Sequence, residues 1–328
     1  MITRRQSMFL FGGGLVAAAC PAVAQSRVLQ LGFLAGASND SRAAPRVQAM
    51  REGLRERGYI EGSNLQIEFR WADGKLDRLP TLAAELVAMK ANVIVVFGSS
   101  AIASAASATK TIPIVMATSS DPVADGYAAS LARPGGNVTG LSSMSAELGA
   151  KRIQLLKEIF PRISRSLAVM WNSTAHGMRA RYEEARSSAP KLGLDVRSIE
   201  VRNLDELESA FASLSKDAPD ALVLIADPFT ASQRARIVDF INFKHIPAVY
   251  ESSDFADAGG LMSYGPDINV QFRRTAYFVD RIVRGAKAGD LPIEQPTNFE
   301  LVINMKTARA MNLQIPSSIL VQATRVIE

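Results

Sequence analysis

A chain of 328 residues is long for one hydrophobic core and suits two. Hydrophobic residues make up 48% of the chain and charged residues 21%, close to the globular average, which excludes a largely disordered chain and a coiled coil. The formal net charge of +5 is too small and too scattered to indicate a nucleic-acid partner.

The first 24 residues have the layout of a secretory signal peptide. Two arginines near the start precede Met8 to Ala19, an apolar run too short to span a bilayer, and Ala22-Val23-Ala24 places small residues before the cleavage point. We therefore expect residues 1–24 to be removed and the mature protein to be periplasmic. The arginine pair fits a twin-arginine signal only loosely, so the export route stays open between that system and Sec.

The only cysteine, Cys20, lies inside this leader. The mature chain would then contain no thiol, which excludes disulfides, a cysteine nucleophile and thiolate metal sites. Lipid attachment at Cys20 is disfavoured, because Ala17 occupies the place where a lipoprotein signal has a large aliphatic residue. No later apolar run approaches the roughly 20 residues of a membrane span, so we expect no stable membrane insertion after leader removal.

Beyond the leader, strand-like and helix-like segments alternate, a pattern that predicts βαβ units around a parallel sheet. In the first half, we expect strands at 28–34, 65–69, 93–97 and 114–117, and helices at 44–57, 79–89 and 101–109. In the second half, we expect strands at 167–170, 196–200, 221–226 and 248–250, and helices at 178–189, 205–214 and 231–242. The same order therefore occurs twice, which predicts an α/β protein of two doubly wound, Rossmann-like lobes.

Two details support the duplication. An Ile-Pro pair leads into the last strand of each half, at 112–113 and 246–247, and a Ser-Ser-Asp sequence follows each strand, at 119–121 and 252–254. Between the halves, Arg133 to Gly140 stops a helix with Pro-Gly-Gly and starts an extended segment. A plain surface turn would have the same composition, but the position between two matching halves favours a hinge crossover.

Three further segments, a strand at 261–263, a helix at 270–284 and a strand at 299–303, add crossings between the lobes. We therefore expect a hinge of about three connections, as two-lobed designs of this kind need. The predicted lobes are 27–142 plus 251–288 for the first and 143–250 plus 289–328 for the second.

Short catalytic motifs are missing from the sequence. His176 and His245 are the only histidines, and neither has a partner at the spacing of a metal site. The chain contains no Walker loop, no Gly-x-Gly-x-x-Gly after a strand, no Gly-x-Ser-x-Gly elbow and no His-Glu-x-x-His pair. Ser99 and Ser100 follow a strand, but no histidine is placed to act as their base. We therefore predict a binding protein without cofactor or metal, although a carboxylate-based enzyme would need no short motif.

Polar residues of the first half gather at the carboxyl ends of predicted strands, where open α/β sheets bind ligands. Ser99 and Ser100 stand at the N-terminus of a predicted helix, whose free amides and positive dipole end attract a carboxylate or a phosphate. Thr118 and Ser119 supply hydroxyl donors after the next strand. Helix capping would explain any single one of these residues, but two such loops in one lobe favour anion binding.

The second half offers carboxylates at the matching positions. Asp227 ends one buried strand and Glu251 ends the next, so carboxylates would face hydroxyls across the predicted cleft. That arrangement suits a ligand with an ammonium group on one side and a carboxylate on the other. Asp227 would serve equally well as the cap of the helix that begins after Pro228. Trp171 and Tyr264 lie near strand ends and are candidates for an apolar wall, although aromatic residues there are more often core.

Motifs along nearly the whole mature chain are shared with one known family. They are Gly32 to Leu34, Gly53 to Tyr59, Glu61 to Asn64, Arg70 to Ala72, Asp121 to Val123, Arg133 to Gly140, Glu147 to Arg152 and Asn304 to Ala308. As a set, they resemble the ABC-transporter substrate-binding proteins of the tryptophan/tyrosine type. No single motif would carry this resemblance alone.

The resemblance implies a type I periplasmic-binding-protein fold, in which two lobes close on a small-molecule ligand and deliver it to a membrane permease with its ATPase. It implies amino acids or related small molecules as ligands, and we expect a monomer. The ligand loops of the family would fall on Ala37, Ser38, Ser99, Ser100, Thr118, Ser119, Asn172, Asp227 and Glu251. Trp171 and Tyr264 complete the set of predicted ligand-binding residues.

The leading hypothesis is the exported solute-binding component of an ABC import system that captures an amino acid or a related carboxylate. The alternative is a periplasmic sensory domain that presents its ligand-bound form to a signalling partner. The effector domain of a repressor shares the fold, but here an export signal stands where such a protein has a helix-turn-helix.

Overall fold

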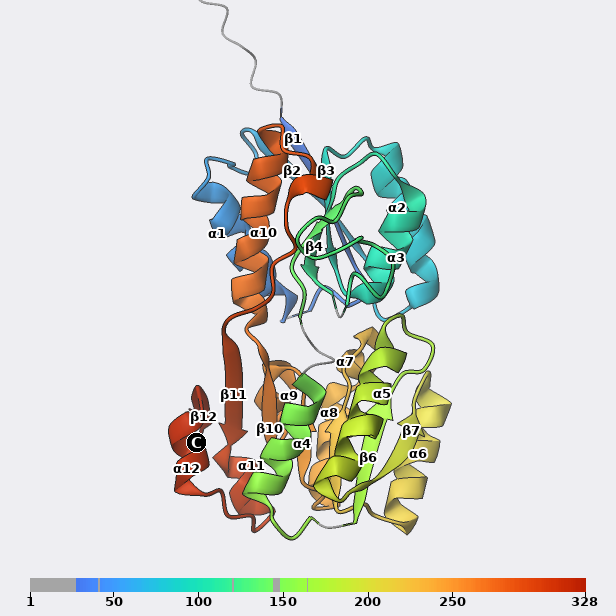
Figure 1. Ribbon diagram of the computed structural model, residues 1–328, viewed down its shortest axis with the longest axis vertical. Coiled ribbons are helices and arrows are strands. Elements are labelled where there is room, and N and C mark those ends of the chain that lie inside the picture. Colours follow the sequence, from blue (N-terminus) through green and yellow to red (C-terminus); the bar gives the residue numbers. More distant parts are fainter. Residues whose placement is uncertain (1–27, 41, 120, 144–147, 164) are drawn as a thin grey trace, which may run out of the picture.

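The computed structural model describes residues 28–328 with the exception of 41, 120, 144–147 and 164. Two α/β lobes lie end to end along the long axis of the molecule (Figure 1). The predicted signal peptide, with Cys20, lies outside the described residues. Within the described part of the chain, no helix is both long enough and apolar enough to cross a membrane.

The first lobe contains a five-stranded parallel sheet in the order β2-β1-β3-β4-β5. Its strands are β1 (Leu29–Ala35), β2 (Leu65–Trp71), β3 (Val93–Phe97), β4 (Ile114–Thr118) and β5 (Val138–Gly140). The sequence of β3, Val-Ile-Val-Val-Phe, is almost continuously buried, as expected for a parallel strand covered on both faces. Those faces are covered by α1 (Ala43–Arg55) with α10 (Ile268–Val283), and by α2 (Leu79–Ala88) with α3 (Ser99–Ala108).

The second lobe contains a seven-stranded sheet in the order β12-β11-β10-β9-β8-β6-β7. Its strands are β6 (Ser166–Trp171), β7 (Asp195–Glu200), β8 (Ala221–Leu224), β9 (Ala248–Tyr250), β10 (Met262–Pro266), β11 (Phe299–Asn304) and β12 (Arg325–Ile327). β10 and β11 are antiparallel, and the other neighbouring pairs are parallel. One face carries α4 (Leu148–Ile159), α5 (Met178–Ser188), α11 (Met305–Ala310) and α12 (Ser317–Gln322). The other carries α6 (Leu204–Lys216), α7 (Pro228–Ser232), α8 (Arg234–Phe243) and α9 (Ser253–Asp257).

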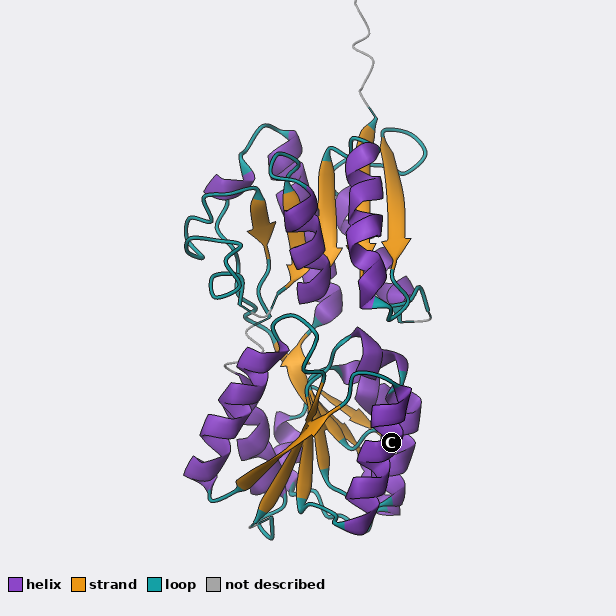
Figure 2. Ribbon diagram, turned by 90° about the vertical axis from the view of Figure 1, so that its right-hand side faces the viewer, coloured by secondary structure: helices purple, strands orange, loops and turns teal. Residues whose placement is uncertain are grey.

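The duplication predicted from the sequence is visible in the strand order. The run β2-β1-β3-β4 of the first sheet corresponds to β7-β6-β8-β9 of the second. In each lobe the order reverses beside the first strand, and such a reversal opens a crevice at the carboxyl ends of the strands. Figure 2 shows the first-lobe strands pointing toward the second lobe, so this crevice faces the other lobe. The prediction of two doubly wound lobes is thus confirmed.

The chain passes between the lobes three times, as predicted. It leaves the first sheet after β5 and enters the second lobe at α4, and it returns from β10 to α10. It finally runs from a short 3-10 helix, Ala288–Asp290, to β11. Both lobes are therefore built from discontinuous stretches of the chain.

The return crossing lies elsewhere than the predicted lobe boundary. The sequence assigns 251–288 to the first lobe, but β10 pairs with β9 and β11 in the second sheet. The crossing falls between Pro266 and Ile268. Conversely, Ile293 packs in a core cluster of the first lobe, which therefore extends past 288. A short apolar strand carries no signal for which of two sheets it joins, and this explains the difference.

Candidate functional site

A cavity of about 150 Å³ lies between the lobes, at the carboxyl ends of β1 and β3 on one side and of β8 and β9 on the other. Its first-lobe wall includes Gly36, Ala37, Arg42, Arg46, Phe97 to Ala101, and Thr118. Its second-lobe wall includes Ala175, His176, Met178, Arg181, Ala226 to Pro228, Ala231, Glu251, Ser252, Asp254 and Phe255. The crevices of both sheets therefore open into one cavity, where the strand order predicts a ligand.

The N-terminus of α3 forms part of the first-lobe wall. Gly98 caps this helix with a φ of +92°, a conformation that glycine adopts without strain and that turns β3 directly into α3. Ser99 and Ser100 are the first residues of the helix, and both line the cavity. The first amides of a helix have no acceptor within it, and the helix dipole adds a partial positive charge. This end of the cavity is therefore suited to an anion.

Two hydroxyl groups near the end of β4 are buried. Thr118 lines the cavity, and its Oγ1 has no hydrogen-bond partner among the described residues. Ser119 Oγ is likewise unpaired within the described chain, but Ser119 is not part of the cavity wall. A buried hydroxyl without a partner costs free energy, so a polar ligand group would stabilise Thr118.

Asp227 is the cap of α7. Its Oδ1 accepts hydrogen bonds from the backbone N and Oγ1 of Thr230, and its Oδ2 accepts from Phe229 N. Asn172 Nδ2 also donates to Oδ2, at 2.7 Å. Asp227 N donates to Thr230 Oγ1, which completes a capping box. Burial raises the pKa of Asp227, while these donors oppose the rise. Of the two interpretations that the sequence leaves open, helix capping is the one that these contacts show.

Glu251 is held by two arginines. Its Oε1 accepts from Nη1 of Arg152 and its Oε2 from Nη1 of Arg181, both at 2.9 Å, and Oε2 also accepts from Ala226 N. Arg152 lies behind the cavity wall, whereas Glu251 and Arg181 line it. Both carboxylates predicted to face a ligand ammonium group, Asp227 and Glu251, thus accept hydrogen bonds from the protein at each oxygen.

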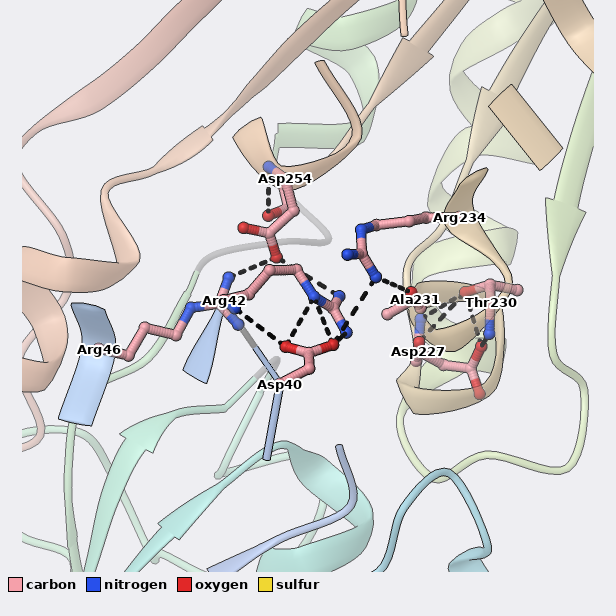
Figure 3. Close-up of polar contacts among 9 residues, drawn as sticks. Asp40, Arg42, Arg46, Asp227, Thr230, Ala231, Arg234 and Asp254 are labelled. Carbon is pink, nitrogen blue, oxygen red and sulfur yellow. Dashed lines mark hydrogen bonds and ion pairs between the residues drawn. The ribbon is translucent and has the colours of Figure 1, made fainter. Parts of the chain in front are cut away.

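A network of charged residues, three of which line the cavity, crosses the cleft between the lobes (Figure 3). Arg46 Nη2 on α1 contacts Oδ2 of Asp254 on α9 at 2.5 Å, and Arg42 Nη1 lies 3.7 Å from the same oxygen. Arg42 also contacts Asp40 at 2.5 Å, and Arg234 of the second lobe lies 3.8 Å from Asp40. Although the partial burial of Asp40 opposes it, Arg42 lowers the pKa of that carboxyl. We call Asp40, Arg42, Arg46, Arg234 and Asp254 the cleft network.

A second set of contacts crosses the cleft at His176. Tyr127 Oη lies 2.9 Å from His176 Nε2, and Asp125 Oδ1 lies 3.4 Å from the same nitrogen. The backbone N of His176 donates to Ser100 Oγ at 3.4 Å. Because His176 belongs to the second lobe and its three partners to the first, these contacts and the cleft network together hold the lobes against each other.

The rest of the wall is largely apolar. Phe97, Met178, Phe255 and Ile268 line the cavity, and the guanidinium of Arg46 lies over the ring of Phe97 at 5.4 Å from its centroid. In an engineered protein, an apolar cavity of comparable volume holds a single aromatic ring. The space between these side chains therefore suits an apolar group of about that size.

The structure brings six of the predicted ligand-binding residues to the cavity wall: Ala37, Ser99, Ser100, Thr118, Asp227 and Glu251. Ser38 lines only a smaller neighbouring cavity of about 10 Å³. Ser119 and Asn172 lie behind the wall, where the carbonyl of Ser119 accepts hydrogen bonds from Ser143 and the amide of Asn172 supports Asp227. These residues shape the site without lining it.

Trp171 and Tyr264 do not line the cavity. Trp171 is 2% exposed, stacks on Tyr182 with ring centroids 4.5 Å apart, and donates its Nε1 hydrogen to Ser198 Oγ. Tyr264 packs against Phe299 beside the core of the second lobe. Both aromatic side chains therefore take the core positions that are usual near strand ends.

Reasoning from the sequence missed the arginines of the site. Arg42 and Arg46 are four residues apart at the start of α1, so they lie on one helix face just after β1. Arg181 stands near the start of α5, after the first strand of the second lobe. This shared position, at the beginning of the helix that follows each lobe's first strand, is the signal that would have found them.

Residues 32–327 match the family described as ABC transporter substrate binding protein. The chain belongs to this family. Its members form a class of binding proteins rather than enzymes, which agrees with the missing catalytic motifs.

Several relatives of this substrate-binding protein are similar over most of its length. An ABC domain from Streptococcus pneumonia in complex with L-Trp has a TM-score of 0.85 at 27% identity, and covers 92% of this chain and 100% of that one. A conserved domain protein from Vibrio cholerae gives the same TM-score of 0.85, identity of 27% and coverage of 92% and 100%. The tyrosine-binding protein of Clostridioides difficile is 26% identical over 264 residues, which are 80% of this chain and 75% of that protein.

More distant structures share the fold alone. A periplasmic binding protein/LacI transcriptional regulator from Alkaliphilus metalliredigens is 12% identical, with a TM-score of 0.56 over 83% of this chain and 96% of that one. Together with the strand order, these similarities confirm the type I periplasmic-binding-protein fold.

Proposed function

We propose that this protein is the exported, periplasmic solute-binding component of an ABC import system, and that its solute is an aromatic amino acid or a related carboxylate. The solute is held in the cavity between the lobes, and the closed form delivers it to a membrane permease with its ATPase. Family membership supports the binding role, and relatives bound to L-Trp or named for tyrosine support the aromatic class. The observation that carries the ligand class is the start of α3 in the cavity wall, beside the hydroxyl of Thr118, which is unpaired among the described residues.

The start of α3 is the part of the cavity wall that best suits an anion. Ser99 and Ser100 are the first residues of this helix and line the cavity, and the helix dipole adds a partial positive charge there. Thr118, whose buried Oγ1 has no hydrogen-bond partner among the described residues, lines the same wall. The charged side chains of the wall balance in number, with Arg42, Arg46 and Arg181 against Asp227, Glu251 and Asp254. A carboxylate on the solute would therefore bind at the start of α3 through charge-assisted hydrogen bonds.

The remainder of the solute would lie against the apolar wall. Phe97 comes from the first lobe, and Met178 and Phe255 come from the second. Since both lobes contribute to the apolar and the polar parts of the wall, a solute contacts all of them only when the lobes are closed. Binding would therefore favour closure, and the closed shape is what a permease can recognise.

Calorimetric titration of the mature protein with L-tryptophan, L-tyrosine and L-phenylalanine tests this proposal. L-Tryptophanamide, which lacks the carboxylate, and indole-3-propionate, which lacks the ammonium group, serve as matched controls. We expect at least one of the amino acids or the deaminated acid to bind and the amide not to bind. Binding of the amide with equal affinity would contradict the carboxylate assignment. No binding by any aromatic carboxylate, with no compaction in small-angle scattering, would contradict the aromatic class.

A further inference from the structure

His176 is the histidine that lines the cavity between the lobes. The chain contains one other, His245, which follows the end of α8 and is not part of this wall. Histidine is the side chain whose ordinary pKa, about 6.5, lies between pH 5 and pH 8. The imidazole of His176 is 42% exposed, so protons reach it from the solvent. His176 is therefore a group at the cleft whose charge can change in this pH range.

The partners of the His176 side chain lie on one loop of the first lobe. Tyr127 Oη lies 2.9 Å from Nε2 of His176, and Asp125 Oδ1 lies 3.4 Å from the same nitrogen. The loop is anchored, because Asp125 N donates to the carbonyl of Asp121 in a turn and Tyr127 packs against a core cluster of the first lobe. Asp125 and Tyr127 therefore move with the first lobe, whereas His176 moves with the second.

The carboxyl group of Asp125 is mostly buried and incompletely paired. Its side chain is 14% exposed, and its Oδ2 is buried without a hydrogen-bond partner among the described residues. Burial raises the pKa of Asp125 and the charge of Asp121 adds to the rise, while His176 and Arg181 oppose it. Both opposing groups belong to the second lobe, so Asp125 loses their effect when the lobes separate.

The charge of His176 decides how well it pairs with Asp125. Burial and the charge of Asp125 raise the pKa of Tyr127, so its hydroxyl keeps its proton and can donate to an unprotonated Nε2. In that state, Asp125 faces a neutral ring. A protonated ring carries a hydrogen on each nitrogen and a positive charge, so Nε2 donates to the oxygens beside it. The carboxylate then gains a charge-assisted interaction across the cleft.

Two positive groups near this pair act against a charged imidazole. Arg181 belongs to the same lobe as His176, so any repulsion between them is present before and after closure and does not affect the equilibrium. The start of α3 does approach on closure, since His176 N donates to Ser100 Oγ at 3.4 Å. A helix N-terminus carries only about half a unit of charge, however. An ionised Asp125 carries a full unit, and the charge of Asp121 acts beside it.

We propose that His176 is a pH-sensitive latch: when its imidazole takes up a proton, it pairs with Asp125 across the cleft and holds the lobes closed. Closure brings a carboxylate to the ring and so favours the protonated form. By linkage, protonation favours closure to the same extent. The closed fraction therefore rises as the pH falls through the range in which the imidazole titrates. This inference goes beyond the proposed function, because it concerns closure and does not depend on which solute binds.

Energy transfer between two dyes, one on each lobe, measures closure without a solute. Ser107 on α3 and Ser213 on α6 are exposed, so Ser107→Cys and Ser213→Cys supply the labelling sites. The mature chain would contain no other cysteine, because the only one, Cys20, lies in the leader. The labelled protein is followed from pH 8 to pH 5.5 at constant ionic strength, with dyes that do not respond to pH. L-Tryptophan is then titrated at both limits.

Three variants are compared in this labelled background. His176→Gln keeps a hydrogen-bonding group for Tyr127 but cannot take up a proton in this range. Asp125→Asn keeps the shape of the carboxyl group and removes its charge. His245→Asn is the matched control, because it removes the other histidine and asparagine tolerates the φ of +53° at that position.

We expect the ratio of closed to open protein to rise about three- to fivefold from pH 8 to pH 5.5, the upper end for a pair with one exposed member. His245→Asn should show the same rise, whereas His176→Gln and Asp125→Asn should show none. If most of the ligand-free protein is open, the Kd of L-tryptophan should fall by the same factor in the wild type and in His245→Asn.

An equal rise in His176→Gln and the wild type would overturn the latch, and so would a wild-type ratio that does not change with pH. A rise that persists in Asp125→Asn would overturn the pairing with this carboxylate. A protein that closes with falling pH as expected, but binds no aromatic amino acid at either pH, would support the latch and contradict the aromatic class of the proposed function.

Discussion

Replacement of Gly36 by alanine tests whether binding requires the lobes to close as they do here. Gly36 follows β1 in the first lobe, and Pro228 begins α7 in the second. A Cβ at Gly36 would lie 2.8 Å from Cγ of Pro228 and 3.1 Å from Cδ2 of Leu76. The end of the Leu76 side chain can rotate away, but the proline ring is rigid, so the added methyl group would hold the lobes slightly apart.

The methyl group costs free energy only in the closed form, because its main obstacle belongs to the other lobe. Overpacking of this kind costs about 1–3 kcal/mol. A factor of ten in an equilibrium constant corresponds to about 1.4 kcal/mol. We therefore expect Gly36→Ala to raise the Kd of the solute about 5- to 150-fold. The melting temperature of the ligand-free protein should change little, since the open form has room for the methyl group.

Calorimetry with the tightest solute of the aromatic panel measures this change. Gly136→Ala is the matched control, because no atom lies closer than 4.0 Å to a Cβ at that position. Pro228→Ala, combined with Gly36→Ala, removes the ring atom that the methyl group meets and should restore most of the lost affinity. A wild-type Kd in Gly36→Ala would refute the reasoning. So would a double variant that binds no better than Gly36→Ala alone.

Three further changes test other contacts. Asp254→Asn removes a carboxylate from the cleft network and should raise the Kd of the solute about tenfold. The control Asp257→Asn, whose partner Arg325 lies in the same lobe, should leave this Kd unchanged. Equal changes of Kd in the two variants would show that the ion pairs across the cleft do not contribute to binding. Asn172→Ala removes a hydrogen bond from Asp227, the buried cap of α7, so the free energy of unfolding, measured with urea, should fall by about 1.5–3 kcal/mol. A fall of less than about 0.5 kcal/mol would contradict this role of Asn172. Because Arg42 lowers the pKa of Asp40, the stability that this pair contributes is complete above the unfolded pKa of 3.8 and is lost as the pH falls below it. The difference in melting temperature between the wild type and Asp40→Asn should therefore shrink steadily below pH 3.8, and a constant difference would argue against the pair.

Much of the fold was predictable because its signals are local. The strands expected at 93–97 and 248–250 agree with β3 and β9, since parallel strands covered on both faces need continuous apolar runs. The helix α9 was not predicted, because five residues are too few for a helical period to show. The assignment of β10 to the second sheet depends on tertiary pairing, which no local pattern contains.

The site was predictable only where topology decides it. The carboxyl-end rule found the start of α3 and Thr118, because strand order alone brings these residues to the crevice. The role of Asp227 and Glu251 depends instead on which donors surround them. Arg152 and Arg181 reach Glu251 from helices far away in the sequence, and their pairing appears only when the second lobe is assembled.

The cleft network and the contacts of His176 join protein atoms only, so they favour closure whether or not a solute is bound. Part of the free energy that favours closure therefore comes from these protein contacts and is the same with or without a solute, and the solute supplies the rest. If these contacts are strong, much of the ligand-free protein would be closed. Closed proteins without solute would then compete with loaded ones for the same transporter. Salt screens the exposed members of these pairs. A higher ionic strength of the surrounding medium would therefore lower the fraction of ligand-free protein that is closed, and with it this competition.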